Sequence, residues 1–210
     1  MAVANQPIEQ LTDPPTRVAV LGTLAEFHRR PIPFDLPALV QLVAALNPDL
    51  LCLDMAPAQW QQRDFEGLPP EYVEGLIPLA DQTDIVVVPI GGARLPVEPT
   101  ALGRRGQLIA LLRGWLTAIQ RTAPDPTDVN QGWRHDLSNL LYHLIDRLVG
   151  GQVEQQWRTH RHHLAQQVLA LARRDPGRRI LVVVNVRHCH HLRPALRAYA
   201  EVEVVSYPEL

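Results

Sequence analysis

The chain has 210 residues, of which 46% are hydrophobic and 20% are charged, and its formal net charge is −2 at pH 7. This composition is typical of a single folded domain. We expect no nucleic-acid partner, because basic residues are not in excess. We expect no membrane partner, because no apolar run approaches the roughly 20 residues of a membrane span. Residues 1–16 show no signal-peptide pattern, so we expect a flexible leader there, one domain over 17–210 and a cytoplasmic location.

Missing residue types exclude several reaction classes. All 20 basic residues are arginine, which excludes Schiff-base chemistry and a P-loop, because both need a lysine. The two serines, Ser138 and Ser206, lie outside any Gly-x-Ser-x-Gly motif, which excludes a serine hydrolase of that type. The two cysteines, Cys52 and Cys189, give no disulfide framework.

Strands and helices alternate in the first half of the chain. Short apolar runs predict strands at 17–22, 50–54 and 84–89. Apolar residues at helical spacing predict helices at 36–46 and 71–82, with a loop at 55–70. This β-α-β-α-β order is typical of a parallel sheet with right-handed crossovers.

A helical insertion interrupts this alternation at about 101–174. Apolar residues at helical spacing predict three helices there, around 108–119, 137–148 and 153–171, with a loop over 123–132. A single crossover between two parallel strands needs fewer helices than this. We therefore expect the insertion to pack over one face or edge of the sheet.

The last segment returns to the sheet. The apolar run 179–184 predicts a strand that is buried on both faces. A helix to about residue 200, with Pro194 in its first turn, and a strand over 202–206 follow. The sequence thus predicts an α/β fold with a mostly parallel sheet of about five strands, flanking helices and a three-helix insertion before the penultimate strand.

Carboxylates, imidazoles and other polar side chains follow the predicted strands. The residues of interest in these positions are Thr23, Glu26, His28, Asp54, Asn185, Arg187, His188, Cys189, His190 and His191. Because the carboxyl ends of parallel strands share one edge of a sheet, we expect these groups to lie near one another. Carboxylates and imidazoles together suit a divalent ion such as zinc, manganese or iron, which would acidify a bound water.

Several of these residues have a second interpretation. Asp54 is also a candidate cap for the turn after its strand. The segment 188–191 could equally be the polar start of a helix with solvated imidazoles. If it binds an ion, at most two of its side chains could share that ion, because adjacent side chains in a turn point in different directions. Cys189 is a candidate low-pKa thiol. His160 lies on the apolar stripe of the third inserted helix, either as a core residue bonded to a neighbour or lowered toward the sheet edge.

Three motifs carry a resemblance to a known family. The first is a strand ending in Gly-Thr at 18–23. The second is the segment 48–54, which has Pro-Asp, then three leucines and a cysteine, and then an acidic residue. The third is the strand 180–184 continuing to His188. In order and spacing they resemble the TraB/Tiki group within the erythromycin-esterase/ChaN-like superfamily. The chain differs from the family pattern at Ala25 in place of histidine, at Asp54 in place of glutamate, and at Asn185 in place of glycine.

The resemblance implies metal-dependent hydrolysis, which in Tiki-like members is peptide cleavage. We predict a divergent member that is a metal-dependent hydrolase or a binder of a small polar ligand, acting on a small molecule or peptide at the carboxyl edge of the sheet. Candidate catalytic residues are Glu26, Asp54 and His188. Candidate metal ligands are His28, Asp54, His188 and His190. Candidate ligand-binding residues are Thr23, Asn185 and Arg187, of which Arg187 would orient an anionic group.

A different class of function stays open. The chain would then be a non-catalytic member that works through protein contacts or as a homodimer. The amphipathic insertion contains Trp115, Trp133 and Trp157, and exposed aromatic-rich surfaces mark interfaces.

Overall fold

A computed structural model of the chain describes residues 15–92 and 103–210. Most of the predicted leader, residues 1–14, and the predicted first residues of the insertion, 101 and 102, lie outside the described part. Thr16, which we assigned to the leader, is instead the first residue of β1.

Five parallel strands form one sheet in the order β3-β2-β4-β1-β5. The strands are β1 (Thr16–Thr23), β2 (Leu50–Leu53), β3 (Val86–Pro89), β4 (Arg179–Asn185) and β5 (Val202–Val205). This confirms the predicted α/β fold. The central strand β4 lies between β2 and β1, so the carboxyl ends of these three strands are neighbours, and the continuous apolar run of β4 is covered on both faces.

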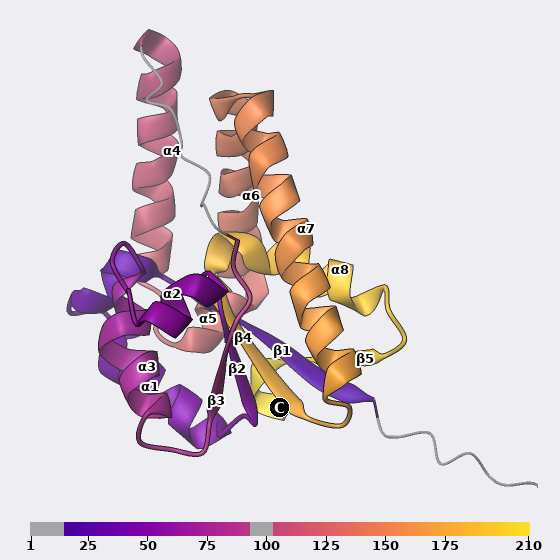
Figure 1. The fold of residues 1–210 in the computed structure, drawn as a ribbon. Helices are drawn as coiled ribbons and strands as arrows, with labels where there is room; N and C mark the ends of the chain where they lie inside the picture. The colour runs from indigo at the N-terminus through magenta and orange to yellow at the C-terminus, as the bar shows by residue number, and fades with distance from the viewer. Residues whose placement is uncertain (1–14, 93–102) are drawn as a thin grey trace, which may run out of the picture.

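Helices cover both faces of the sheet (Figure 1). One face carries α1 (Leu36–Leu46), the π-helix η2 (Glu71–Leu76) and α3 (Ile77–Ala80), and the other carries α7 (Gly151–Arg174) and α8 (Cys189–Arg197). Side chains alternate along β4, so that Leu181 and Val183 enter the first core while Val182 and Val184 enter the second.

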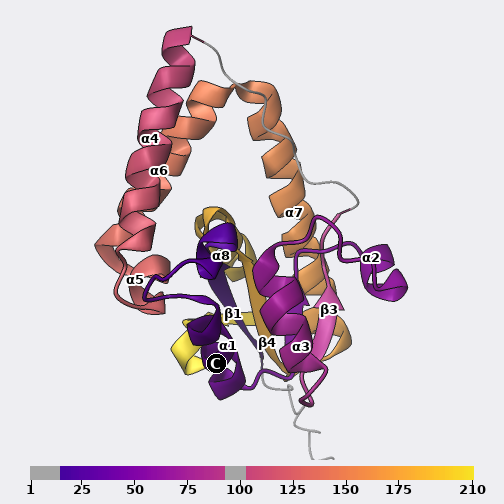
Figure 2. The same cartoon turned by 90° about the vertical axis from the view of Figure 1, so that its left-hand side faces the viewer.

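The insertion comprises α4 (Gly103–Arg121), α5 (Pro126–Asn130), α6 (Gly132–Val149) and α7. Three long helices of the insertion, α4, α6 and α7, extend away from the sheet (Figure 2). A small core of its own joins α4 to α6, made by Ile109, Leu112, Leu116, Leu141 and Ile145. No helix in the described ranges is both long and apolar enough to cross a membrane.

Four local predictions differ from the structure. The predicted loop at 55–70 contains a short helix, α2 (Pro57–Gln62), and the loop at 123–132 contains α5, whose first amides are capped by the Asp125 carboxylate. The first half of the helix predicted over 71–82 is the π-helix η2. Pro194 lies inside α8, because the 3₁₀ turn η3 (Val186–His188) begins directly after β4 and α8 starts at Cys189. The remaining short turns are η1 (Ala25–Arg29) and η4 (Tyr207–Glu209).

Candidate functional site

Asp54, His160 and His188 meet at the carboxyl edge of the sheet. Asp54 directly follows β2, and His188 ends the turn after the neighbouring strand β4. His160 comes from α7, one turn before Leu164, which packs in the core of the sheet. The Nε2–H of His160 donates to Oδ2 of Asp54 over 2.8 Å. One ligand atom from each of the three residues lies within 4.8 Å of the other two.

The two imidazoles of this group are buried. His160 and His188 are only 6% and 3% exposed. The indole of Trp157 lies against His188, with ring centroids 5.1 Å apart, and Nδ1 of His188 is buried with no hydrogen-bond partner among the described residues. Burial, with a smaller contribution from the positive charge of Arg187, lowers the pKa of His188 well below its usual value, so the ring is neutral and keeps a lone pair for a ligand.

A cavity of about 280 Å³ opens beside the group. Its lining includes Asp54, Trp157 and His188, together with Glu71 and Tyr72 from the π-helix. π-Helical turns of this kind are frequent at functional sites. The Tyr72 hydroxyl donates to the Val183 carbonyl over 2.8 Å, which fixes η2 against β4.

Glu71 is a buried carboxyl in this cavity. It is 1% exposed, and its Oε1 accepts the hydroxyl hydrogen of Thr23 over 2.8 Å. Its Oε2 is buried and has no hydrogen-bond partner among the described residues. Burial raises the pKa of Glu71, and the Thr23 hydrogen bond only partly offsets this. Perturbed carboxyls of this type are typical of acid–base groups.

Arg187 supplies the positive charge of the cavity. Its guanidinium pairs with the Asp146 carboxylate of α6, and it lies over the Trp157 ring at 4.6 Å from the centroid. The backbone N–H of Arg187 donates to the Asn185 side chain, which also lines the cavity. The insertion and the strand end are therefore joined at the wall of the site.

The structure thus brings five of the predicted residues to this edge. Asp54 and His188 belong to the central group, Asn185 and Arg187 line the cavity, and Thr23 holds the buried Glu71. The Asp54 carboxylate is bonded to His160 and does not cap the following turn. Of the two interpretations of His160, the second one agrees with the structure, since this side chain reaches the sheet edge.

Glu26 and His28 lie elsewhere. Glu26 is on the exposed turn η1, where its carboxylate pairs with Arg29 and its side chain is 71% exposed. The His28 ring is buried under the same turn. Its Nε2 accepts the Leu24 N–H, and its Nδ1–H donates to the Phe34 carbonyl. Both ring nitrogens of His28 are thus occupied in holding the loop after β1, and burial lowers its pKa to about 4.

His190 and Cys189 are also outside the central group. The His190 ring lies against the tilted ring of His191 with 3.9 Å between centroids, and burial lowers the pKa of His190 to about 3. Cys189 is fully buried against Gly22. Burial raises the pKa of the Cys189 thiol to about 11, which is opposite to the lowered pKa of the candidate low-pKa thiol.

Glu71, Tyr72 and Trp157 were not predicted as site residues. An acidic residue at the start of a helix, after Pro70, is the ordinary partner of the helix dipole, so Glu71 gave no signal of its own. Tyr72 and Trp157 read as core residues at helical spacing. One signal could have pointed to Trp157: it shares an apolar helix stripe with His160, and a polar residue on a buried helix face is unusual.

Gly91, in the loop after β3, packs directly on Asp54. A Cβ at this position would lie 2.6 Å from Oδ1 of Asp54 and 2.7 Å from the Met55 nitrogen. We therefore expect Gly91→Ala to displace Asp54, to lower the free energy of unfolding by about 1–3 kcal/mol and to reduce any metal content measured with the purified protein.

Gly114→Ala is the matched control for this substitution. Gly114 lies within α4, and a methyl group added there would have no neighbouring atom within 4 Å among the described residues. Alanine should therefore stabilise the protein by roughly 0.5–1 kcal/mol. Denaturant unfolding of both variants checks the two signs. Equal stability of Gly91→Ala and the parent chain would contradict the close packing on Asp54.

Comparison with known proteins gave no match to a family model, a curated protein or a solved structure.

Proposed function

We propose that the chain is a metal-dependent hydrolase whose ion would be held by Asp54, His160 and His188, the ion taking the place of the proton that Nε2 of His160 shares with Asp54. The meeting of these three residues carries the proposal. Two imidazoles and one carboxylate are a ligand set of catalytic zinc and of iron sites, and such sites keep a further position for water or substrate. The neutral His188 ring, with a buried nitrogen that lacks a hydrogen-bond partner among the described residues, fits a ligand role.

The polar residues around the cavity supply the remaining roles. A bound divalent ion would acidify a water and polarise the bond that is cleaved. Glu71, with its raised pKa and one oxygen without a partner in the described part of the chain, is the group that would accept the proton of the attacking water and return it to the leaving group. Arg187 would orient an anionic part of the substrate. The small cavity favours a small molecule or a single residue of a peptide as the bound group.

The resemblance to the TraB/Tiki group is part of this proposal. Asp54 matches the acidic residue that ends the second family motif, and His188 matches the histidine of the third. The first family histidine is absent at Ala25, and we infer that His160 from the insertion provides the missing imidazole. This arrangement would make the insertion a necessary part of the site.

Metal analysis tests the proposal. The untagged protein, loaded with zinc, manganese or iron(II) and then freed of unbound ion, should retain about one ion per chain. His160→Ala should lower the affinity by more than the roughly 10–100-fold that loss of an outer partner costs. His163→Ala, three residues further along α7 and outside the group, should bind as the parent does. Negligible binding by the parent chain would refute the metal-dependent reaction.

Association through the insertion is the second candidate function. Large apolar side chains are exposed on α4 and α6, namely Leu108, Leu111, Trp115, Trp133, Leu140 and Leu144. Trp157, which we had placed in the same surface, is buried in the site instead. An exposed apolar surface of this kind is typical of an interface.

Trp115→Glu tests this second function. The Trp115 side chain is 56% exposed, so a charge there should leave the fold intact but prevent apolar contact between chains. If the protein associates through α4, sedimentation should change from a concentration-dependent dimer to a monomer. Glu in place of the exposed Leu140 on α6 extends the test to the second helix. A monomeric parent chain would argue against self-association.

A further inference from the structure

A second cavity lies between α6, α7 and α8, next to the first one. Its volume is about 450 Å³. Asp146 lines this cavity, whereas its ion-pair partner Arg187 lines the first, so the Arg187–Asp146 pair forms part of the wall between them. The second cavity contains none of Asp54, His160 and His188 and is a separate candidate site.

The charged side chains of this cavity leave an excess of positive charge. Three arginines line it, Arg147, Arg158 and Arg161, against two carboxylates. Both carboxylates are already paired, Asp146 with Arg187 and Glu154 with Arg158 at 3.2 Å. Within the described part of the chain, Arg147 and Arg161 make no ion pair, and the charge of the cavity is not neutralised.

Arg161 is the most buried of the three arginines in this cavity. It is 7% exposed, and its Nη1 is buried with no hydrogen-bond partner among the described residues. A buried guanidinium nitrogen without an acceptor costs free energy, and an anion in the cavity would supply that acceptor.

The imidazoles of the cavity suit the same kind of ligand. His143, His162 and His191 come from three different helices and line it together with the arginines. A neutral imidazole donates one N–H, and an arginine donates up to five. The lining therefore offers many donors and few free acceptors, which is the recognition pattern of an oxyanion.

We propose that this second cavity binds a small ligand bearing a multivalent oxyanion, either a phosphate group or a di- or tricarboxylate. Arg161 would hold the anion from the floor of the cavity, and Arg147 and Arg158 would hold it from the rim. The site requires no metal ion at Asp54, so it can be tested whether or not the proposed hydrolase function is correct.

Titration calorimetry with pyrophosphate, inorganic phosphate and citrate tests this site, at constant ionic strength with potassium chloride as the reference. At least one of the three should bind the full-length protein saturably with one site. The pyrophosphate and citrate arms separate a phosphate ligand from a carboxylate ligand. Arg161→Gln should weaken binding about tenfold or more, because a hydrogen bond to a charged group is lost.

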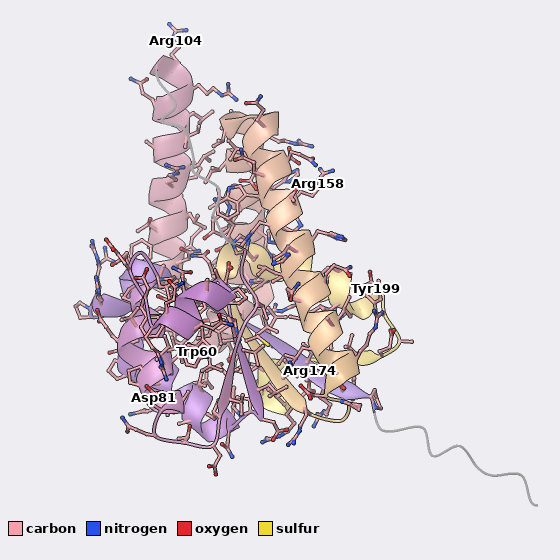
Figure 3. The ribbon with its side chains drawn as sticks, viewed as in Figure 1. Trp60, Asp81, Arg104, Arg158, Arg174 and Tyr199 are labelled. Carbon is pink, nitrogen blue, oxygen red and sulfur yellow. The ribbon has the colours of Figure 1, made fainter. Side chains whose placement is uncertain are left out.

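Two further variants make the result decisive. Arg147 is exposed on α6, so Arg147→Gln should fold normally and still weaken binding. Arg174 lies near the other end of α7 from Arg158, beside the sheet (Figure 3), and Arg174→Gln should bind as the parent does. Equal weakening in all three variants would overturn the proposal, because it would show that the anion responds only to the overall charge of the protein. The absence of saturable binding by all three anions would overturn it as well.

Discussion

Glutamine in place of Glu71 should slow the proposed hydrolysis by roughly 10²–10⁴-fold, the usual contribution of a general acid–base group. Glutamine keeps the shape of the side chain and an acceptor for the Thr23 hydroxyl, but it can neither take nor return a proton. Turnover of a panel of small esters and peptides by the metal-loaded protein measures the effect. Metal content should stay unchanged, because Glu71 is outside the group formed by Asp54, His160 and His188.

The same substitution should stabilise the protein at neutral pH. The pKa of Glu71 is raised above 4.5 in the folded chain, so the folded state holds this proton more tightly than the unfolded state. Stability from this source is complete below pH 4.5 and is lost as the pH rises through the folded-state pKa. Glu71→Gln should therefore be more stable than the parent at pH 8, and the difference should disappear at pH 4.

Glu74→Gln is the matched control for this prediction. Glu74 is on the same π-helix, but its carboxylate pairs with Arg29 at the surface and its side chain is 43% exposed. Glu74→Gln should affect neither turnover nor the sign of the pH dependence, because its ion pair lies in solvent and contributes little to stability. A Glu71→Gln variant with parental turnover would remove Glu71 from the reaction while leaving the metal site open to its own test.

Asparagine in place of Asp146 should lower the free energy of unfolding by more than the roughly 0–1 kcal/mol of a surface pair, because it removes the carboxylate from a largely buried ion pair with Arg187. The two side chains are only 12% and 10% exposed, and they join η3 to α6. Chemical unfolding of the full-length variant measures the loss. The cavity lining should also become less ordered, since Arg187 lies over Trp157.

Asp81→Asn provides the comparison for a solvated pair. Asp81 pairs with Arg63 at 3.5 Å, and both side chains are more than half exposed, so the loss should stay within about 1 kcal/mol. If Asp146→Asn cost no more than this control, the pair would not hold the insertion against the sheet.

The sheet could be predicted because its signals are local. The uninterrupted apolar run from Ile180 to Val184 is sufficient to indicate a strand covered on both faces. Pro194 misled the prediction, because a proline suits the first turn of a helix, and the prediction overlooked Asn185, a residue type that often caps the start of a helix. Here the Asn185 side chain accepts the Arg187 N–H and starts the turn early.

The site was only partly predictable. Asp54 and His188 follow neighbouring strands, and the topology alone brings them to one edge. His28 looked equally suitable from its position, but its role depends on two backbone bonds to Leu24 and Phe34 that no spacing rule reveals. The contribution of His160 depends on how α7 docks, over a separation of 106 residues from Asp54, and periodicity gives the face of a helix but not its partner.

One helix serves both the core and the site. The half of α7 after Leu164 is anchored among apolar residues of the sheet, whereas the half before it carries Trp157 and His160. Inserting or deleting a single residue between His160 and Leu164 would rotate the two halves against each other by about 100°. We therefore expect a change of length within this helix to disrupt the site. A longer or shorter insertion would have to differ before Val153, where the loops joining α4, α5 and α6 can accommodate the change.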